Sequence, residues 1–228
     1  QNIKLLLSMG DHKIIACASN YRTLRSHGID VDILCLLERG AYEYNNYLSV
    51  KNEFGTGKTK LYASTTCDHR LHQLFEEVMV FFRPGSVPLC LFSTSDSQIM
   101  FNDGPQTVNT GVGLCVAIGA QECILVGVDL GTASVDDPRS KDAVGHSDRE
   151  FDMKVAGNFQ EFVYSTRLLV DGKESMERCL ESCPEMNVYN ASNGALISGA
   201  SPITLTSYIK KNMQKVKVSE NDNLFNWW

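Results

Sequence analysis

The chain has 228 residues, 43% of them hydrophobic and 21% charged, which is enough to bury a core without disulfides or metal staples. Its net charge of −6, with no stripe of Lys and Arg, excludes a non-specific binder of nucleic acid or anionic membranes. No apolar run reaches the roughly 20 residues of a membrane-spanning helix, and no signal peptide is visible.

In chain order, short apolar runs alternate with amphipathic segments, which is the pattern of βα units around a mostly parallel sheet. The runs IIACA, ILCLL and ILVGV are continuous, as expected of strands buried on both faces. The predicted strands are Lys13–Ser19, Asp32–Leu37, Lys60–Ser64, Pro88–Phe92, Glu122–Val128 and Asn187–Asn190. The predicted helices are Tyr21–His27, Arg70–Phe82, Pro105–Ile118, Ser165–Ser182 and Pro202–Asn212.

These elements predict one α/β, Rossmann-like domain over residues 1–200, followed by a C-terminal helix and tail over residues 201–228. Within the domain, residues 155–164 (VAGNFQEFVY) predict a small hairpin that turns at Gly157 and Asn158.

Eight cysteines lie along the chain, most of them inside apolar runs, where cysteine acts as a small hydrophobic residue. None forms a Cys-x-x-Cys pair, so the ligand spacing of a metal site is missing. We therefore expect reduced structural thiols, no metal site and a cytoplasmic location.

Two short segments imitate functional motifs. Gly55–Thr59 reads GTGKT, but a phosphate-binding P-loop needs a glycine where this chain has Asn52, so we expect a surface turn before a strand. Cys67–His72 reads CDHRLH, and here Asp68 as the N-cap of a helix is the better interpretation than a metal ligand.

Polar side chains follow three of the predicted strands. Asp129 ends ILVGV, Ser19 and Asn20 follow the first strand, and Glu38 and Arg39 follow the second. Ligands of open α/β sheets bind beyond the carboxyl ends of the strands, so these residues are candidates for a binding site. The alternative is that each strand simply ends in polar residues.

The helix predicted after Pro105 begins with Gln106 and Thr107, and free N–H groups at a helix start suit an anionic or nucleotide ligand. Capping explains part of this pattern. His146 lies in a polar loop between Gly145 and Ser147, and its ordinary pKa of roughly 6.5 suits proton transfer near neutrality. A loop histidine can equally be a plain exposed residue.

The segments VGVDLG, GHSDREF, VAGNFQEFVYST and VYNASNGALISGASPI together resemble the motility-associated factors, which are flagellin glycosyltransferases. This domain family is also described as 6-hydroxymethylpterin pyrophosphokinase-like. The same scaffold is similar to bacterial sialyltransferases that use CMP-activated sugars. The resemblance implies a sialyltransferase-like GT-A variant with a mostly parallel sheet and helices on both faces.

The resemblance also implies roles for individual residues. His146 would be the general base that deprotonates the acceptor hydroxyl, and Arg39 would be an alternative to Glu38 in flanking the nucleotide. No metal or other cofactor is expected; the partners would be a CMP-activated nonulosonic acid and a flagellin-like protein acceptor. The implied nucleotide contacts are Gln106, Thr107, Gly127, Asp129, Ser19, Asn20, Glu38, Ser192 and Asn193.

One motif of these families is missing. They begin with an apolar strand and a Gly-x-Gly-Pro-Ser loop, whereas this chain opens QNIKLLLSMGDHK, so we expect that strand to lie outside this chain or to have diverged. Two other functions stay open. An ATP-dependent 6-hydroxymethylpterin pyrophosphokinase would need Mg²⁺ held by carboxylates, which form no evident pair here. A non-catalytic domain that binds a partner protein is the second.

Overall fold

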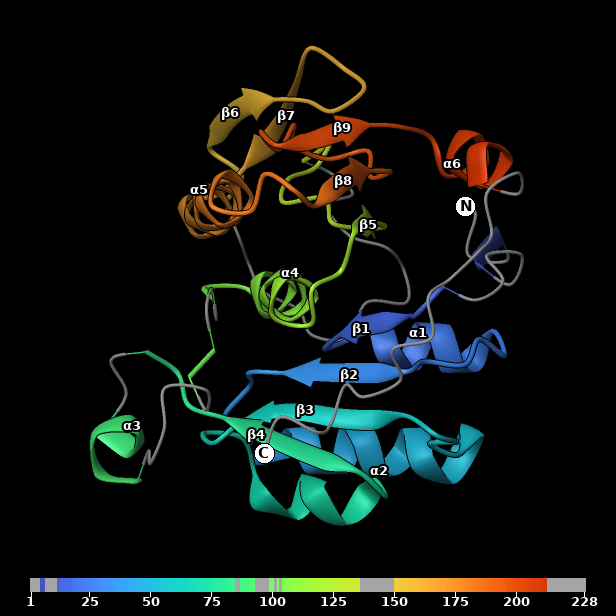
Figure 1. Cartoon of the computed structure of the whole chain (residues 1–228), viewed down its shortest axis with the longest axis vertical. Coiled ribbons are helices and arrows are strands. Elements are labelled where there is room, and N and C mark those ends of the chain that lie inside the picture. The colour runs from blue at the N-terminus through green and yellow to red at the C-terminus, as the bar shows by residue number, and fades with distance from the viewer. Residues whose placement is uncertain are drawn as a thin grey trace. The chain divides into compact units, whose positions relative to one another are not determined.

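The computed structural model describes residues 5–6, 12–84, 87–92, 99–100, 102, 104–135 and 150–212. The chain divides into two compact units, one ending at residue 103 and one beginning at Gly104 (Figure 1). Each unit has its own parallel sheet and its own apolar core, so the predicted α/β class with parallel strands is confirmed. The single domain predicted for residues 1–200 stays a prediction.

The first unit contains four parallel strands whose order in the sheet equals their order in the chain. All residues of the second strand are buried, in agreement with its continuous apolar run. Because the strands are parallel, their carboxyl ends meet at one edge of the sheet. The strands are β1 (Ile15–Cys17), β2 (Ile33–Leu36), β3 (Lys60–Ser64) and β4 (Val78–Phe81).

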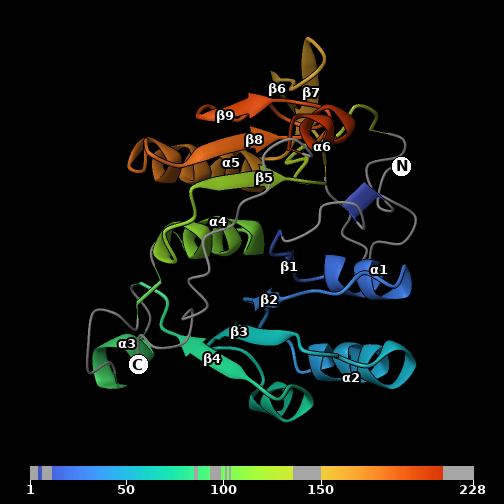
Figure 2. The ribbon, with the colours of Figure 1, turned by 45° about the vertical axis from the view of Figure 1, so that its right-hand side comes forward.

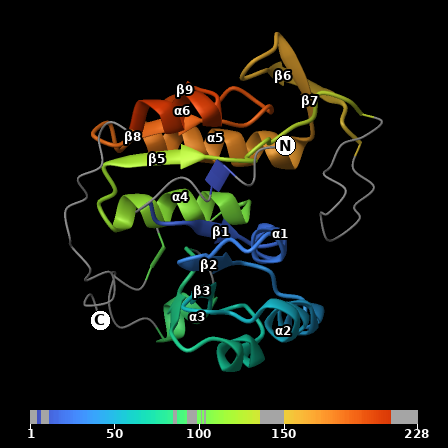
Figure 3. The ribbon, with the colours of Figure 1, turned by 90° about the vertical axis from the view of Figure 1, so that its right-hand side faces the viewer.

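Helical segments connect these strands. They are α1 (Asn20–Ser26), α2 (Tyr42–Phe54) and the 3-10 helix η2 (His69–Leu74), and α3 (Val87–Phe92) follows β4. Figure 3 shows α1 and α2 on the same side of the sheet, as right-handed crossovers between consecutive strands require. Tyr21 of α1 and Val50 of α2 are buried there in one cluster with Leu34 and Leu61 of the sheet.

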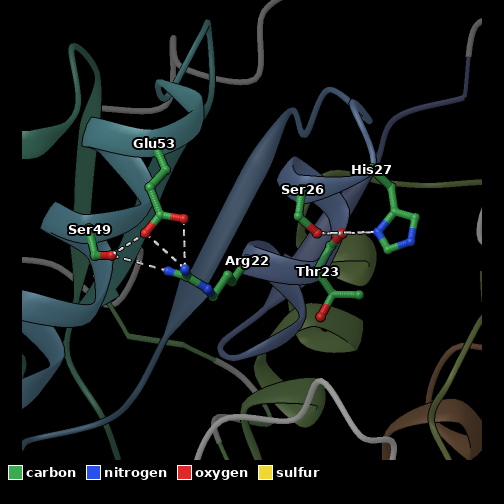
Figure 4. A network of polar contacts seen from close by, with 6 residues as sticks. All are labelled: Arg22, Thr23, Ser26, His27, Ser49 and Glu53. Atoms are coloured by element: carbon green, nitrogen blue, oxygen red, sulfur yellow. Dashed lines mark hydrogen bonds and ion pairs between the residues drawn. The ribbon is translucent and has the colours of Figure 1, made fainter.

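A polar network joins α1 to α2 at the surface (Figure 4). Arg22 donates from Nη2 to the two carboxylate oxygens of Glu53 at 2.9 and 2.8 Å, and from Nη1 to Ser49 Oγ at 3.3 Å. At the C-terminal end of α1, Nδ1 of His27 lies 2.9 Å from the Thr23 carbonyl oxygen. Exposed ion pairs contribute little to stability, so the buried apolar residues hold the two helices on the sheet.

The second unit contains a three-stranded parallel sheet, with β8 between its two neighbours (Figure 2). An antiparallel hairpin of β6 and β7 confirms the hairpin predicted over residues 155–164. The strands are β5 (Glu122–Leu125), β6 (Met153–Ala156), β7 (Phe162–Ser165), β8 (Asn187–Asn190) and β9 (Ala200–Pro202). The helices are α4 (Thr107–Ala117), α5 (Arg167–Glu181) and α6 (Leu205–Asn212).

Helices contact both faces of β8. Val188 is buried in a cluster with Val112 of α4 and Met176 of α5. The next residue, Tyr189, points to the opposite face because side chains alternate along a strand, and its ring centroid lies 5.5 Å from that of Tyr208 in α6. The sheet of this unit is therefore covered on two sides.

Two predicted elements are wrong. The predicted strand Pro88–Phe92 lies within helix α3, because a short apolar run has no period that separates strand from helix. The predicted helix Arg70–Phe82 is η2 followed by β4, since pairing with β3 draws Val78–Phe81 into the sheet. The sequence pattern also did not predict α2, β4 or β9.

The GTGKT segment forms a turn before a strand and Asp68 caps a helix, as predicted for the two segments that resemble functional motifs. Gly55 ends α2 with φ +68°, and the chain turns there into β3. Asp68 caps η2 by accepting a hydrogen bond from the Arg70 amide at 3.0 Å. In the part of the chain that the structure describes, no helix has both the length and the apolar character needed to cross a bilayer.

Candidate functional site

The strand ends of the second unit are joined by Ser192. Its amide donates to Asn190 Oδ1 at 3.0 Å, and its hydroxyl accepts a hydrogen bond from the Val128 amide at 2.8 Å. The Ala191 amide donates to the Leu125 carbonyl at 2.9 Å. Ser192 is 2% exposed and forms a buried link between the segments that follow β5 and β8, while its nucleotide contact stays a prediction.

Asp129 and Asn193 lie beside each other on this link. The Asn193 amide donates to the Asp129 carboxylate and lowers its pKa, but packing around the carboxyl has the larger effect and raises the pKa. Asp129 is nevertheless exposed as a residue, so its carboxyl combines a partly desolvated setting with access to solvent.

The backbone makes its closest approach at Gly194. The Ala195 amide donates to the Asp129 carbonyl at 2.7 Å, and a Cβ placed on Gly194 would lie 1.8 Å from that oxygen. Only glycine fits there. The segment 189–194 (YNASNG) therefore packs directly against the Asp129 backbone at Gly194.

Asn158 supports the same link and was missed by the sequence pattern. Its Nδ2 donates to the Asn190 carbonyl at 2.9 Å and to the Ser192 carbonyl at 2.8 Å, and its amide donates to the Gly194 carbonyl at 2.9 Å. The residue is 8% exposed, and among the described residues its Oδ1 has no hydrogen-bond partner. The Gly-Asn signal of the hairpin predicted the turn but not this role.

The start of α4 packs close to Leu130, the residue that follows Asp129. The Gln106 amide donates to Asn109 Oδ1 at 3.2 Å, and Asn109 Nδ2 donates to the Gly172 carbonyl of α5 at 2.8 Å. A Cβ on Gly172 would lie 2.9 Å from Gln106 Cγ and 3.8 Å from Leu130 Cδ2. The start of α4 therefore meets α5 beside the residue that follows Asp129.

Gln106 also carries a donor that suits a ligand. Its Nε2 is buried and has no hydrogen-bond partner among the described residues. Thr107 is 8% exposed and Thr110 is fully buried, so the polar opening turn faces inward. By contrast, Gly127 is exposed, has φ +68° and has open space where a side chain would be.

The remaining described candidates lie in the first unit, at the carboxyl edge of its sheet. Ser19 and Asn20 are exposed at the start of α1, and Ser19 makes no capping bond. Glu38 accepts from the Leu37 amide at 3.1 Å, and Arg39 is exposed beside it. The structure thus places these residues after β1 and β2, as predicted.

Glu38 belongs to a charged group at this edge. Burial, reinforced by Glu38, raises the pKa of the Cys67 thiol to about 12, and Arg83 opposes this rise. Burial also raises the pKa of Glu43, and Glu38 adds to that rise. Within the described ranges, however, no three His, Cys, Asp or Glu side chains gather closely enough to hold a metal ion.

The predicted general base His146 lies outside the described residues, as do Gly145 and Ser147. In the second unit Asp129 and Asn193 are hydrogen-bonded neighbours next to the buried Ser192, and Gln106 lies at Gly172, which is also close to Leu130. Ser19, Asn20 and Glu38 belong to the first unit. An arrangement of amide groups around a partly desolvated carboxyl can bind a polar ligand through several hydrogen bonds.

Comparison with known proteins gives two matches. The family model described as 6-hydroxymethylpterin diphosphokinase MptE-like matches residues 1–134. A solved structure, the MAf glycosyltransferase from Magnetospirillum magneticum, is similar with a TM-score of 0.80 and 30% identity. The match covers 98% of this chain and 33% of that one, so this chain spans about one third of its relative's length. No curated protein matches.

Proposed function

The chain belongs to the MptE-like family, and on that premise we propose that it is the nucleotide-sugar-binding part of a glycosyltransferase. The proposed reaction transfers a nonulosonic acid of the sialic or pseudaminic type from a CMP-sugar to a hydroxyl of a flagellin-like protein. The finer fold assignment, a Rossmann-like GT-A variant of the sialyltransferase type, belongs to this proposal, as do a cytoplasmic location and independence of metals and other cofactors.

The observation that carries the proposal is the meeting of three segments in the second unit. The start of α4 packs at Gly172 of α5, which also lies close to Leu130. The residue before Leu130, Asp129, accepts a hydrogen bond from the Asn193 amide in the loop after β8. The relationship to the MAf glycosyltransferase supports sugar transfer as the chemistry of such a site. The side-chain Nε2 of Gln106, buried and without a hydrogen-bond partner among the described residues, is the group that we assign to the nucleotide.

In the proposed mechanism His146 takes the proton of the acceptor hydroxyl as its oxygen attacks the anomeric carbon of the donor sugar. The bond from that carbon to the CMP phosphate breaks, and the configuration is inverted. A positioned base contributes about 10²–10⁴-fold to such a step. Hydrogen-bond donors at the departing phosphate contribute a comparable or larger factor, and Gln106 is proposed to be one of them.

The family description favours a second candidate, a 6-hydroxymethylpterin diphosphokinase. That enzyme would transfer diphosphate from ATP and would need Mg²⁺ held by carboxylates. In the first unit Glu38 and Glu43 are near enough for the charge of Glu38 to raise the pKa of Glu43, so these two carboxylates are the ones that we assign to Mg²⁺ in this alternative. The two candidates differ in the nucleotide that they bind.

A thermal-shift experiment separates them. CMP and CTP are expected to raise the melting temperature of the 228-residue chain, because a ligand at about 100 times its Kd stabilises a fold by about 2.7 kcal/mol. Stabilisation by ATP with Mg²⁺ and 6-hydroxymethylpterin, without an effect of CMP, would instead establish the kinase. No stabilisation by any nucleotide would favour a partner-binding domain.

Matched variants then locate the site. Gln106→Ala is expected to weaken CMP binding about 3- to 10-fold, the cost of one hydrogen bond. Gln121→Ala changes an exposed glutamine before β5 and should bind CMP like the unchanged chain. In the complete protein, His146→Ala should abolish sugar transfer while CMP binding persists; full activity would refute the assignment of the base.

A further inference from the structure

The turn between α4 and β5 places two cysteines side by side. The Gly119 amide donates to the Val116 carbonyl at 3.0 Å, and the Ala120 amide reaches back to the Cys115 carbonyl at 2.9 Å. With Gly119 at φ +69°, this is a Schellman motif, which reverses the chain at the end of the helix. β5 then starts at Glu122 and runs back past the last turns of α4.

This reversal brings Cys123 of β5 to Cys115 of α4. The two thiols form a sulfur–sulfur hydrogen bond, and both side chains pack against the apolar core of the second unit. Neither Cys115 nor Cys123 forms a disulfide, and both are half-buried.

We propose that Cys115 and Cys123 are a redox-active dithiol that closes to an intramolecular disulfide when a peroxide oxidises it. Neither residue belongs to the proposed nucleotide site, since they lie at the opposite end of α4 from Gln106. The proposed disulfide is therefore a covalent modification that does not depend on the proposed transferase activity.

The chemistry balances with hydrogen peroxide as the oxidant. The Cys115 thiolate attacks one peroxide oxygen, the O–O bond breaks, and Cys115 sulfenic acid and water form. The Cys123 sulfur then attacks the Cys115 sulfur, the S–O bond breaks, and a second water leaves. Two thiols and one peroxide thus give one disulfide and two waters.

The direction of attack follows from the hydrogen bond. The bond from Cys123 lowers the pKa of the Cys115 thiol, and this effect outweighs the burial that would raise it. This lowered pKa supports Cys115 as the attacking thiol in the proposal, with Cys123 as the resolving thiol.

Digestion after glutamate tests the proposal, because Glu122 lies between the two cysteines. The 228-residue chain is treated with a slight excess of hydrogen peroxide, alkylated, and digested without reductant. Mass spectrometry should find the peptide 78–122 joined to the peptide 123–150. Absence of the joined peptides, while other thiols of the same sample become oxidised, would overturn the proposal.

Serine variants identify the sulfur atoms involved. Peptide 78–122 also contains Cys90, so Cys115→Ser must abolish the joined peptides, whereas Cys90→Ser must keep them at the unchanged level. A joined product that survives Cys115→Ser would refute the pair. In Cys123→Ser, dimedone should label Cys115 sulfenic acid, and circular dichroism of each variant shows that the fold is retained.

Discussion

Asn158 offers the sharpest test of how the candidate site is supported. Asn158→Ala removes the hydrogen bonds to two buried carbonyls. The Asn190 carbonyl keeps a second donor, the Ile203 amide at 3.1 Å, so its loss costs about 1 kcal/mol. The Ser192 carbonyl loses the 2.8 Å bond from Asn158 and becomes an unsatisfied buried acceptor, which costs about 1–3 kcal/mol. The total expected loss of unfolding free energy is about 2–4 kcal/mol.

Urea unfolding followed by far-UV circular dichroism measures this loss, and hydrogen exchange over residues 190–197 shows whether it arises at the loop after β8. Gln160→Ala is the matched control, because Gln160 is exposed and makes one 3.3 Å bond to the Asn193 carbonyl. Its cost should stay within about 0.5 kcal/mol. If Asn158→Ala costs no more than Gln160→Ala, Asn158 does not support the loop and the reasoning fails.

Three further predictions concern the second unit. Gly194→Ala should cost at least about 3 kcal/mol or prevent folding, whereas Gly127→Ala, at φ +68° in open space, should cost about 1 kcal/mol; urea midpoints and soluble yields compare them. Burial raises the pKa of Asp129, so its contribution to stability is present below the unfolded pKa and is lost as pH rises through the folded pKa. Asp129→Asn should therefore raise the urea midpoint at about pH 7, and this gain should vanish toward about pH 3. Tyr208→Phe removes the 2.5 Å hydrogen bond to Glu122 and should cost about 1–2 kcal/mol by urea unfolding, with a cost near zero arguing that α6 is held by its apolar face alone.

The sequence predicted best where one short apolar run is bounded by turn residues. Lys60–Ser64 and Asn187–Asn190 are strands over the predicted residues, because each must be buried and neither is long enough for a helix. Arg70–Phe82 failed because its Leu, Gln and Glu residues favour a helix locally, whereas β3 offers Val78–Phe81 a hydrogen-bonding partner. α2 was missed because its Asn and Tyr residues are weak helix formers; burial of its Tyr47 and Val50 stabilises it.

The binding roles assigned to the candidate site residues stay predictions. Asp129 and Asn193, which follow two parallel strands, are hydrogen-bonded neighbours, because the carboxyl ends of parallel strands share one edge. The Ser192 hydroxyl accepts a hydrogen bond from the Val128 amide, a structural contact that the sequence pattern did not indicate. Asn158 could not be found from the sequence, because its acceptors are carbonyls 32 and 34 residues away and no side-chain pattern marks them.

The strand order of the two sheets has a consequence for synthesis on the ribosome. In the first unit each new strand pairs with the strand made just before it, so the sheet can grow as the chain emerges. β5 instead pairs with β8. Glu122 can pair with Asn187 only after β6, β7 and α5 have been synthesised. During that interval the β8-facing edge of β5 has no strand to bind, and this is the stage at which a nascent chain is most exposed to wrong pairing.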